Sequence, residues 1–228
     1  MQGEGTVVEL MLVSGLPAAR ISCAPGLIPA PGRYVLAYAE GSLSPLATWL
    51  YAFRAKEDGF ICASPAPPEW RPGNRLYMRG PLGCGFEPPA AAKRVALVAV
   101  GHTTARLLAL VETALRGDAS VTLVCDDAPE ELPLQIEVQP MRALAEVCRW
   151  SDYAAFDVSR ERLPELMKVL GEQPLSAVGG EAQVLVDTPM PCGGLADCGV
   201  CTVRTRQGPL LGCKDGPVFD LKLLALER

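Results

Sequence analysis

The chain has 228 residues, with 21 Lys and Arg against 26 Asp and Glu, a formal net charge of −5 and nine cysteines. An acidic chain without a basic cluster argues against nucleic acid as a partner. Because no run of 18 apolar residues and no secretory signal pattern occurs, we expect a protein without a membrane span in the reducing cytoplasm.

Short apolar segments separated by Gly- and Pro-rich turns fill the first part of the chain. Their alternation and their β-branched residues predict strands. Several short strands joined by such turns favour a small antiparallel β-barrel over residues 1–88. The predicted strands cover residues 6–13, 33–39, 47–54, 59–63 and 74–79, and residues 25–32 form a loop.

The pattern changes after a linker at residues 86–94. The continuous apolar run at 95–100 is typical of a parallel strand buried on both faces, and an amphipathic helical pattern follows at 103–115. Alternating strands and helices predict a Rossmann-like parallel half-sheet domain over residues 93–186. A further strand is expected at 121–125 and further helices at 141–148 and 160–170, and residues 183–186 lead into the cysteine segment.

Four cysteines lie close together in a third predicted unit, residues 187–228. Their spacing is C-x5-C-x2-C-x11-C, with three thiols in one Gly-rich loop and the fourth after a short hairpin. Fe–S clusters need four converging thiolates, and the plant-type spacing C-x4-C-x2-C…C is close to this one. Glycines let backbone N–H groups approach the cluster sulfurs. We predict a [2Fe–2S] cluster held by Cys192, Cys198, Cys201 and Cys213 in a loop shaped by Gly193, Gly194 and Gly199.

Other roles for these thiols stay open. A structural zinc site usually has two Cys-x2-Cys knuckles or a Cys2His2 set. This segment has one knuckle, Cys198 and Cys201, and the only histidine, His102, is distant in sequence. An odd number of cysteines in a chain of this length does not suggest a disulfide framework. Inert or oxidised thiols are the remaining alternative.

Several segments resemble one protein family, in the same order along the chain. GCKDGPVFD at 212–220, preceded by PMPCGG and CGVC, is similar to the cluster-binding module of dihydroorotate dehydrogenase electron-transfer subunits. GPLGCGF at 80–86 resembles the turn that closes the flavin barrel of that family, and PGRYV at 31–35 resembles its PGQFV strand. The resemblance implies a ferredoxin reductase-like order of barrel, nucleotide-type domain and [2Fe–2S] tail.

The flavin segment of that family is altered here. Relatives hold FAD with an Arg-Pro-x-Ser/Thr motif, whose Arg makes bidentate bonds to the pyrophosphate. The equivalent stretch is LSPLAT at 43–48, where Pro45 remains but Ser44 replaces the Arg and Ala47 replaces the hydroxyl residue. The barrel also lacks an obvious counterpart of the Gly-rich segment that lies on the flavin phosphates in relatives. These departures make FAD binding doubtful.

The nicotinamide segments are altered as well. VAVGHTTAR at 98–106 lies where relatives have VGGG-x-G-x-AP, a turn whose glycines let a pyrophosphate approach a helix N-terminus. Gly101 and Ala105 remain, but β-branched Val100 would crowd a phosphate and Arg106 replaces the proline. FDVSRE at 156–161 replaces the Cys-Gly-Pro motif that relatives place opposite the nicotinamide. We therefore expect NAD(P) binding to be lost.

The cysteine spacing has one departure of its own. Cys192 and Cys198 enclose five residues, where relatives usually have four. Some relatives use an Asp as a ligand, and Asp197 is present, but it lies too close to Cys198 to replace the first ligand comfortably. The prediction therefore keeps Cys192.

Residues outside the cysteine loop are assigned no catalytic role. His102, in a strand-to-helix turn, is interpreted as structural because no positioned acid or nucleophile accompanies it. The acidic run at 126–131 is expected to be a solvated loop rather than a replaced phosphate site. Isolated thiols usually behave as small hydrophobes. These are Cys23, Cys62, Cys84, Cys125 and Cys148, while Arg71, Arg75 and Arg79 are expected at the surface.

These observations predict an electron-transfer subunit that relays single electrons through the cluster to or from a partner oxidoreductase. The resemblance implies a dihydroorotate dehydrogenase-like catalytic subunit or another redox enzyme as that partner, in a hetero-oligomer. One alternative is a non-catalytic scaffold subunit with a structural cluster. Another is an FAD-containing subunit that uses non-standard flavin contacts.

Overall fold

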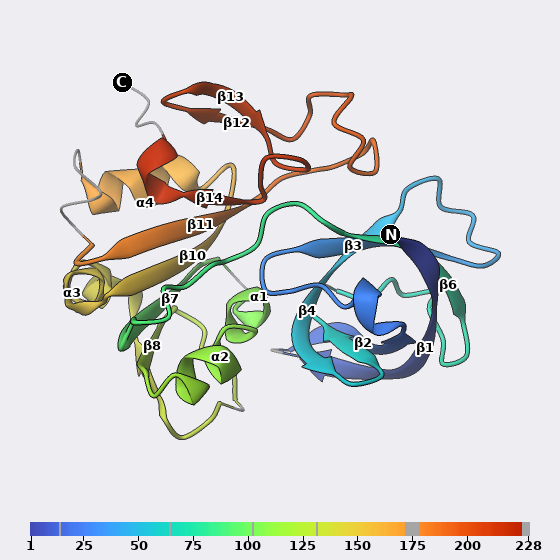
Figure 1. Ribbon diagram of the computed structural model, residues 1–228, viewed down its shortest axis with the longest axis horizontal. Coiled ribbons are helices and arrows are strands. Elements are labelled where there is room, and N and C mark those ends of the chain that lie inside the picture. Colours follow the sequence, from blue (N-terminus) through green and yellow to red (C-terminus); the bar gives the residue numbers. More distant parts are fainter. Residues whose placement is uncertain (14, 64, 102, 131, 172–177, 225–228) are drawn as a thin grey trace.

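The computed structural model describes residues 1–228 except 14, 64, 102, 131, 172–177 and 225–228. A barrel lies on the right of Figure 1 and an open sheet on the left, and the cysteine-rich segment passes above both. The expected antiparallel barrel and parallel half-sheet are both confirmed. In the described part of the chain, no helix is long and apolar enough to cross a membrane.

Six antiparallel strands close the barrel. Pairing of the first and last strands completes the ring, so no edge is left open. The order around the barrel is β1 (Gln2–Val13), β2 (Leu16–Cys23), β5 (Gly59–Cys62), β4 (Thr48–Lys56), β3 (Tyr34–Ala39) and β6 (Arg75–Leu82). Burial alternates along the first part of β6, as the alternating pattern predicts, whereas β3 and β5 are buried at consecutive positions.

One barrel strand, β2, was not predicted from the sequence. Its segment LPAARISC contains Pro and Ala, which are poor strand formers, and only its second half alternates. In the structure it pairs with β1 on one side and β5 on the other. Neighbouring strands therefore impose an extended conformation that local propensity does not favour. A short 3-10 helix, η1 (Pro25–Leu27), lies in the predicted loop that follows.

The second sheet has six strands. Five are parallel, and the sixth, β14, runs antiparallel to β11 at one edge. The segments of β9 and β10 were not recognised as strands, although β10 is buried along nearly its whole length. The order is β14 (Val218–Asp220), β11 (Glu181–Asp187), β10 (Tyr153–Ser159), β7 (Arg94–Val100), β8 (Ser120–Val124) and β9 (Ile136–Gln139).

The prediction of a single helix over residues 103–115 is wrong. Two short helices occupy that segment, α1 (Ala105–Leu108) and α2 (Val111–Arg116). The first packs against barrel strand β4 and the second against β8 of the sheet. A straight helix could not follow both surfaces, and the chain bends between them through an i to i+3 hydrogen bond from Leu110 to Leu107.

The other two predicted helices are present with shifted bounds. A 3-10 turn, η2 (Met141–Ala143), precedes α3 (Leu144–Trp150). The last helix is α4 (Leu163–Leu170), which begins later than expected and has Pro164 in its first turn, where a proline is tolerated. Helices α1 and α2 share a core with the barrel, whereas α3 and α4 pack in a second core on the opposite face of the sheet.

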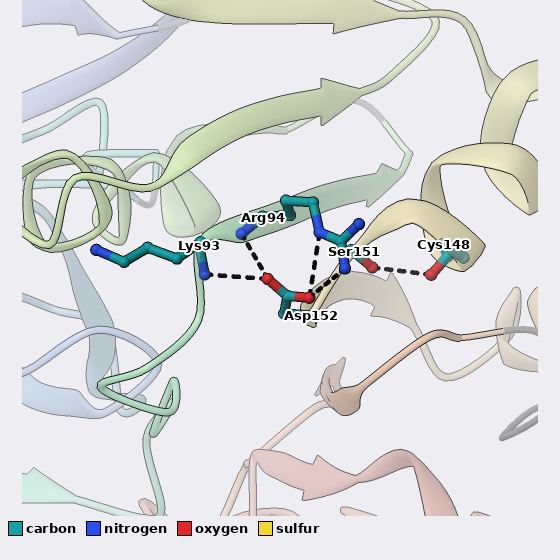
Figure 2. A network of polar contacts seen from close by, with 5 residues as sticks. All are labelled: Lys93, Arg94, Cys148, Ser151 and Asp152. Atoms are coloured by element: carbon teal, nitrogen blue, oxygen red, sulfur yellow. Dashed lines mark hydrogen bonds and ion pairs between the residues drawn. The ribbon is translucent and has the colours of Figure 1, made fainter.

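An ion pair holds the beginnings of β7 and β10 together (Figure 2). The Asp152 carboxylate accepts hydrogen bonds from the backbone N–H groups of Lys93 and Arg94, at 3.1 and 3.0 Å. The Arg94 guanidinium also donates to Asp152, at 2.6 and 3.2 Å. Nearby, the Ser151 hydroxyl donates to the carbonyl of Cys148 at 2.9 Å. These contacts lie at the amino ends of the strands and fix their relative register.

Candidate iron–sulfur site

The structure brings the four predicted ligand cysteines together as two pairs. Cys198 contributes to the lowered pKa of Cys192, and Cys201 contributes to the raised pKa of Cys213, so the thiols lie near one another in these two pairs. The two pairs are close enough to interact electrostatically, because the charge of Cys192 acts on Cys213. Cys201 and Cys213 are buried, whereas Cys198 is exposed. The site therefore has one side in the protein core and one side at the surface.

The loop backbone supplies hydrogen-bond donors to the sulfurs. The backbone N–H groups of Asp197, Cys198 and Leu195 donate to Cys192 and lower its pKa to about 6, against the effect of burial. A backbone N–H of Ala196 donates to Cys213. Stabilising sulfur as thiolate is what a metal-binding loop requires. Asp197 thus contributes its backbone, and its side chain is exposed.

Four residues of the loop have a positive φ angle. Gly193, Gly194 and Gly199 have φ angles of 63, 70 and 68°, as expected from their role in shaping the loop. Ala196 also has a positive φ, 60°, which the sequence did not reveal. This left-handed conformation directs several N–H groups to one side of the loop. The site thus depends on one residue that is not a glycine.

No group of three or more His, Cys, Asp or Glu side chains that could hold a metal ion occurs among the residues that the structure describes. The four thiols are instead arranged two by two. A single tetrahedral ion needs four donors around one point, whereas a two-iron cluster takes two thiolates on each iron. Two pairs of thiols are the kind of donor set that a two-iron cluster takes.

The barrel anchors the cysteine loop through two side chains that the sequence did not single out for this role. The Tyr34 hydroxyl donates to the backbone carbonyl of Cys213 at 2.9 Å, and burial raises the pKa of Tyr34 so that the proton stays in place. Arg79 donates to the carbonyl of Gly193. The expected surface location of Arg79 is therefore wrong in part, because its side chain is half-buried under the loop. Arg71 and Arg75 are exposed as expected.

The two turns that carried the family resemblance contact each other. The backbone N–H of Cys84, in the GPLGCGF turn, donates to the carbonyl of Gly216, in the DGPVF turn, at 2.6 Å. A Cβ on Gly83 would lie 2.6 Å from that carbonyl oxygen. Only glycine allows this approach of the two backbones. The end of the barrel and the end of the cysteine module are thus fitted to one another.

A short hairpin carries the fourth cysteine back to the loop. Strands β12 (Thr202–Thr205) and β13 (Gly208–Leu211) form it, as the sequence predicted. The N–H of Gly212 donates to the carbonyl of Cys201 at 2.9 Å, and the N–H of Leu211 donates to the Asp215 carboxylate at 2.8 Å. These bonds hold Cys213 next to Cys201. Strand β14 and the 3-10 turn η3 (Leu221–Leu223) then pack onto the main sheet.

Among the described residues, the segments expected to have lost coenzyme contacts hold few polar groups that a phosphate could use. The exception is the buried hydroxyl of Thr103, which has no hydrogen-bond partner. The Ser44 hydroxyl is used within its own turn, where it accepts from the N–H of Leu46 at 3.2 Å. Ala47 is buried. In the turn after β7, Val100 is buried and Arg106 pairs with carboxylates. These residues do not fit the phosphate-binding contacts that the fold family uses, and His102 lies outside the described residues.

The curated proteins to which the chain is similar include two electron transfer subunits. No protein-family model matches the chain. The chain is 25% identical over 162 residues to the electron transfer subunit of dihydroorotate dehydrogenase B (NAD(+)) from Clostridium perfringens, and 29% identical over 173 residues to that from Desulforamulus reducens. Each match covers 65% of this chain and 65% of the relative. The chain thus spans just under two thirds of the length of the curated relatives.

Solved structures share the fold at low identity. The NADH-dependent reduced ferredoxin-NADP oxidoreductase, studied for flavin-based electron bifurcation, has a TM-score of 0.71 at 16% identity over 97% of this chain and 90% of that chain. The ferredoxin reductase of carbazole 1,9a-dioxygenase has a TM-score of 0.61 at 16% identity over 80% of this chain and 68% of that chain. The chain is therefore similar in sequence to dihydroorotate dehydrogenase electron transfer subunits, and it has the ferredoxin reductase-like fold.

Proposed function

We propose that this chain is an electron-transfer subunit that passes single electrons to or from a partner oxidoreductase through a [2Fe–2S] cluster. The observation that supports the proposal is that the four thiols act on one another in two pairs, with loop N–H groups acting on Cys192 and Cys213. Cys192 and Cys198 would ligate one iron, and Cys201 and Cys213 the other. When bound, such a cluster supplies reversible one-electron chemistry.

The contributions of the chain's own residues follow from the site. Backbone N–H groups around Cys192 favour thiolate and would stabilise the more reduced state through N–H···S bonds. The barrel residues Tyr34 and Arg79 hold the loop carbonyls of Cys213 and Gly193 and so limit its motion. Burial of Cys201 and Cys213 keeps water from one side of the site. Exposure of Cys198 leaves the other side open to a docking protein.

The partner is proposed from the relatives. Because the curated relatives are electron transfer subunits of dihydroorotate dehydrogenase B, a catalytic subunit of that kind, or another oxidoreductase, is the partner that we propose. We further propose that the chain uses no NAD(P) and no family-type FAD site, because Arg106 is paired with carboxylates and the Ser44 hydroxyl is used within its own turn. We also propose that the chain resides in the reducing cytoplasm, where its nine cysteines would not be driven into disulfides.

Metal, acid-labile sulfide and flavin content of protein purified without oxygen tests this proposal. We expect two irons and two sulfides per chain with a visible absorption spectrum. C192S and C198S should each lose or alter the cluster spectrum. C84S is the matched control, since Cys84 is an exposed thiol outside the loop. One zinc per chain without sulfide, or an unchanged spectrum in C192S, would contradict the assignment.

A second measurement separates the relay from a scaffold role. In a relay, the co-purifying partner reduces or oxidises the cluster within its turnover time. In a scaffold, deleting the chain dissociates the complex, but changing the cluster potential leaves partner activity unaltered. Stoichiometric FAD in the purified protein would instead favour a flavin-containing subunit with non-standard contacts.

A further inference from the structure

The crevice in which an open α/β sheet binds its ligand can be located from the strand order. Chain order along the sheet reverses between β7 and β10, since β8 and β9 lie on one side of β7 and the later strands on the other. Ligands of such sheets bind outside the carboxyl ends of the strands at this switch point. In this chain the switch point lies between the end of β7 and the end of β10.

A buried ion pair lies at this switch point. Arg106, in α1 just after β7, donates through Nε and Nη2 to the two carboxylate oxygens of Asp157 on β10, both at 2.7 Å. Its Nη1 lies 3.1 Å from the carboxylate of Asp187, at the end of β11. The side chains of Arg106 and Asp157 are only 9% and 2% exposed. All three guanidinium nitrogens thus have carboxylate partners, of which Asp157 is buried and Asp187 is partly exposed.

The same guanidinium reaches the barrel. It lies 5.3 Å from the centroid of the Tyr51 ring on β4, in a cation–π contact. Helix α1, which carries Arg106, packs against β4. The arginine is therefore in contact with the barrel and with two strands of the sheet. The Arg106 guanidinium therefore joins the barrel to the sheet at the switch point where sheets of this kind bind a dinucleotide.

The pairing keeps Arg106 charged. Burial alone would lower the pKa of Arg106, but Asp157 and Asp187 outweigh this effect and raise it, so the guanidinium stays charged. Burial raises the pKa of Asp157, and Arg106 opposes the rise by bonding both oxygens. The half-exposed carboxylate of Asp187 would repel a phosphate at the edge of the crevice. A dinucleotide would have to break the pair and overcome that repulsion.

We propose that Arg106, Asp157 and Asp187 form a built-in plug that fills the dinucleotide crevice and clamps the sheet to the barrel. The chain then cannot accept a hydride from a nicotinamide of its own. This inference deepens the proposed function, because it makes another protein the source of the electrons. The pair also joins the two altered segments, because Arg106 lies in residues 98–106 and Asp157 in residues 156–161.

Two measurements on the cluster-loaded full-length protein test the plug. The first is titration with NADH and with NADPH, followed by calorimetry. We expect no saturable binding up to millimolar nucleotide. Binding of either nucleotide at one per chain would overturn the exclusion. Cluster absorbance is recorded on the same samples. Absence of a cluster would contradict the proposed electron relay, but it would leave the result on nucleotide binding valid.

The second measurement is backbone hydrogen exchange in R106M and in the double variant R106M/D157L. The single variant leaves a buried carboxylate unpaired, and the double variant replaces the pair by apolar side chains of similar size, which removes that penalty. We expect faster exchange in α1 and β4 in both variants, with the larger loss of thermal stability in R106M. The control is R94A, which breaks the exposed pair at the other end of β7 and β10 and should leave α1 and β4 unchanged. Unchanged exchange in the double variant would overturn the clamp.

Discussion

The hydroxyl of Tyr34, on a barrel strand, donates to the backbone carbonyl of Cys213, the last of the four loop cysteines, at 2.9 Å. The two residues are 179 positions apart. A single hydrogen bond thus connects the barrel to the carbonyl of a proposed cluster ligand. Because the contact is buried, the carbonyl has no water to replace a lost donor.

Tyr34→Phe tests this connection. Removing the hydroxyl leaves a buried carbonyl unpaired, and we expect a loss of about 1–2 kcal/mol in the free energy of unfolding. Denaturant unfolding followed by circular dichroism measures the change. Tyr38→Phe is the control, because Tyr38 is exposed on the same strand. Equal stability of the two variants would show that the buried bond contributes nothing.

Arg79→Ala should loosen the cysteine loop from the barrel. The lost hydrogen bond to the Gly193 carbonyl frees the loop next to Cys192, so we expect the cluster absorbance to bleach several-fold faster in air. Arg75→Ala serves as the comparison, since Arg75 lies on the same strand and pairs with Glu4 at the surface. Bleaching at the wild-type rate in Arg79→Ala, or equally fast bleaching in Arg75→Ala, would count against the anchoring role.

Ala196→Gly should stabilise the loop. A non-glycine residue at φ 60° costs roughly 1 kcal/mol in backbone conformation, which glycine avoids. The expected outcome is a higher melting temperature or slower cluster loss than in wild type, whereas Ala196→Val should have the opposite effect because Val is β-branched. Ala92→Gly, at a position without positive φ, should not stabilise. A melting temperature that falls in Ala196→Gly would contradict the strain.

Cys148 should resist alkylation at pH 8. Burial raises its pKa to about 12, so the thiol is fully protonated well above neutral pH, and the side chain is inaccessible. Reaction requires the thiolate and access to it. Iodoacetamide followed by peptide mass spectrometry should label exposed Cys84 within minutes and leave Cys148 unlabelled until the protein is denatured. Rapid labelling of both thiols in the native state would refute the burial of Cys148.

Local signals made part of this structure predictable. The four cysteines and their glycines lie in one short segment of the chain. The loop and its hairpin could therefore be recognised from the sequence alone. Alternation did the same for most barrel strands. Strand β2 was missed because its neighbours, rather than its own residues, make it extended.

The remaining features depend on contacts between distant segments. Arg106 and Asp157 are 51 residues apart, and Tyr34 and Arg79 are more than 100 residues from the loop groups that they bind. In the sequence, Arg106 was noted only because it replaces the proline of the relatives' nucleotide-binding turn. Nothing in the neighbouring residues showed that its charge has a buried partner. The positive φ of Ala196 was hidden for the same reason, since alanine carries no turn signal.

Strand β14 follows the last cysteine in the chain and covers one edge of the main sheet by pairing with β11. During synthesis all four thiols have therefore emerged before that edge can be closed. A chain shortened before Val218 would leave β11, whose Val184 and Leu185 are fully buried, with an unpaired side that invites association with other strands. Truncated products of this protein should accumulate as aggregates, even though the missing segment holds none of the proposed ligands.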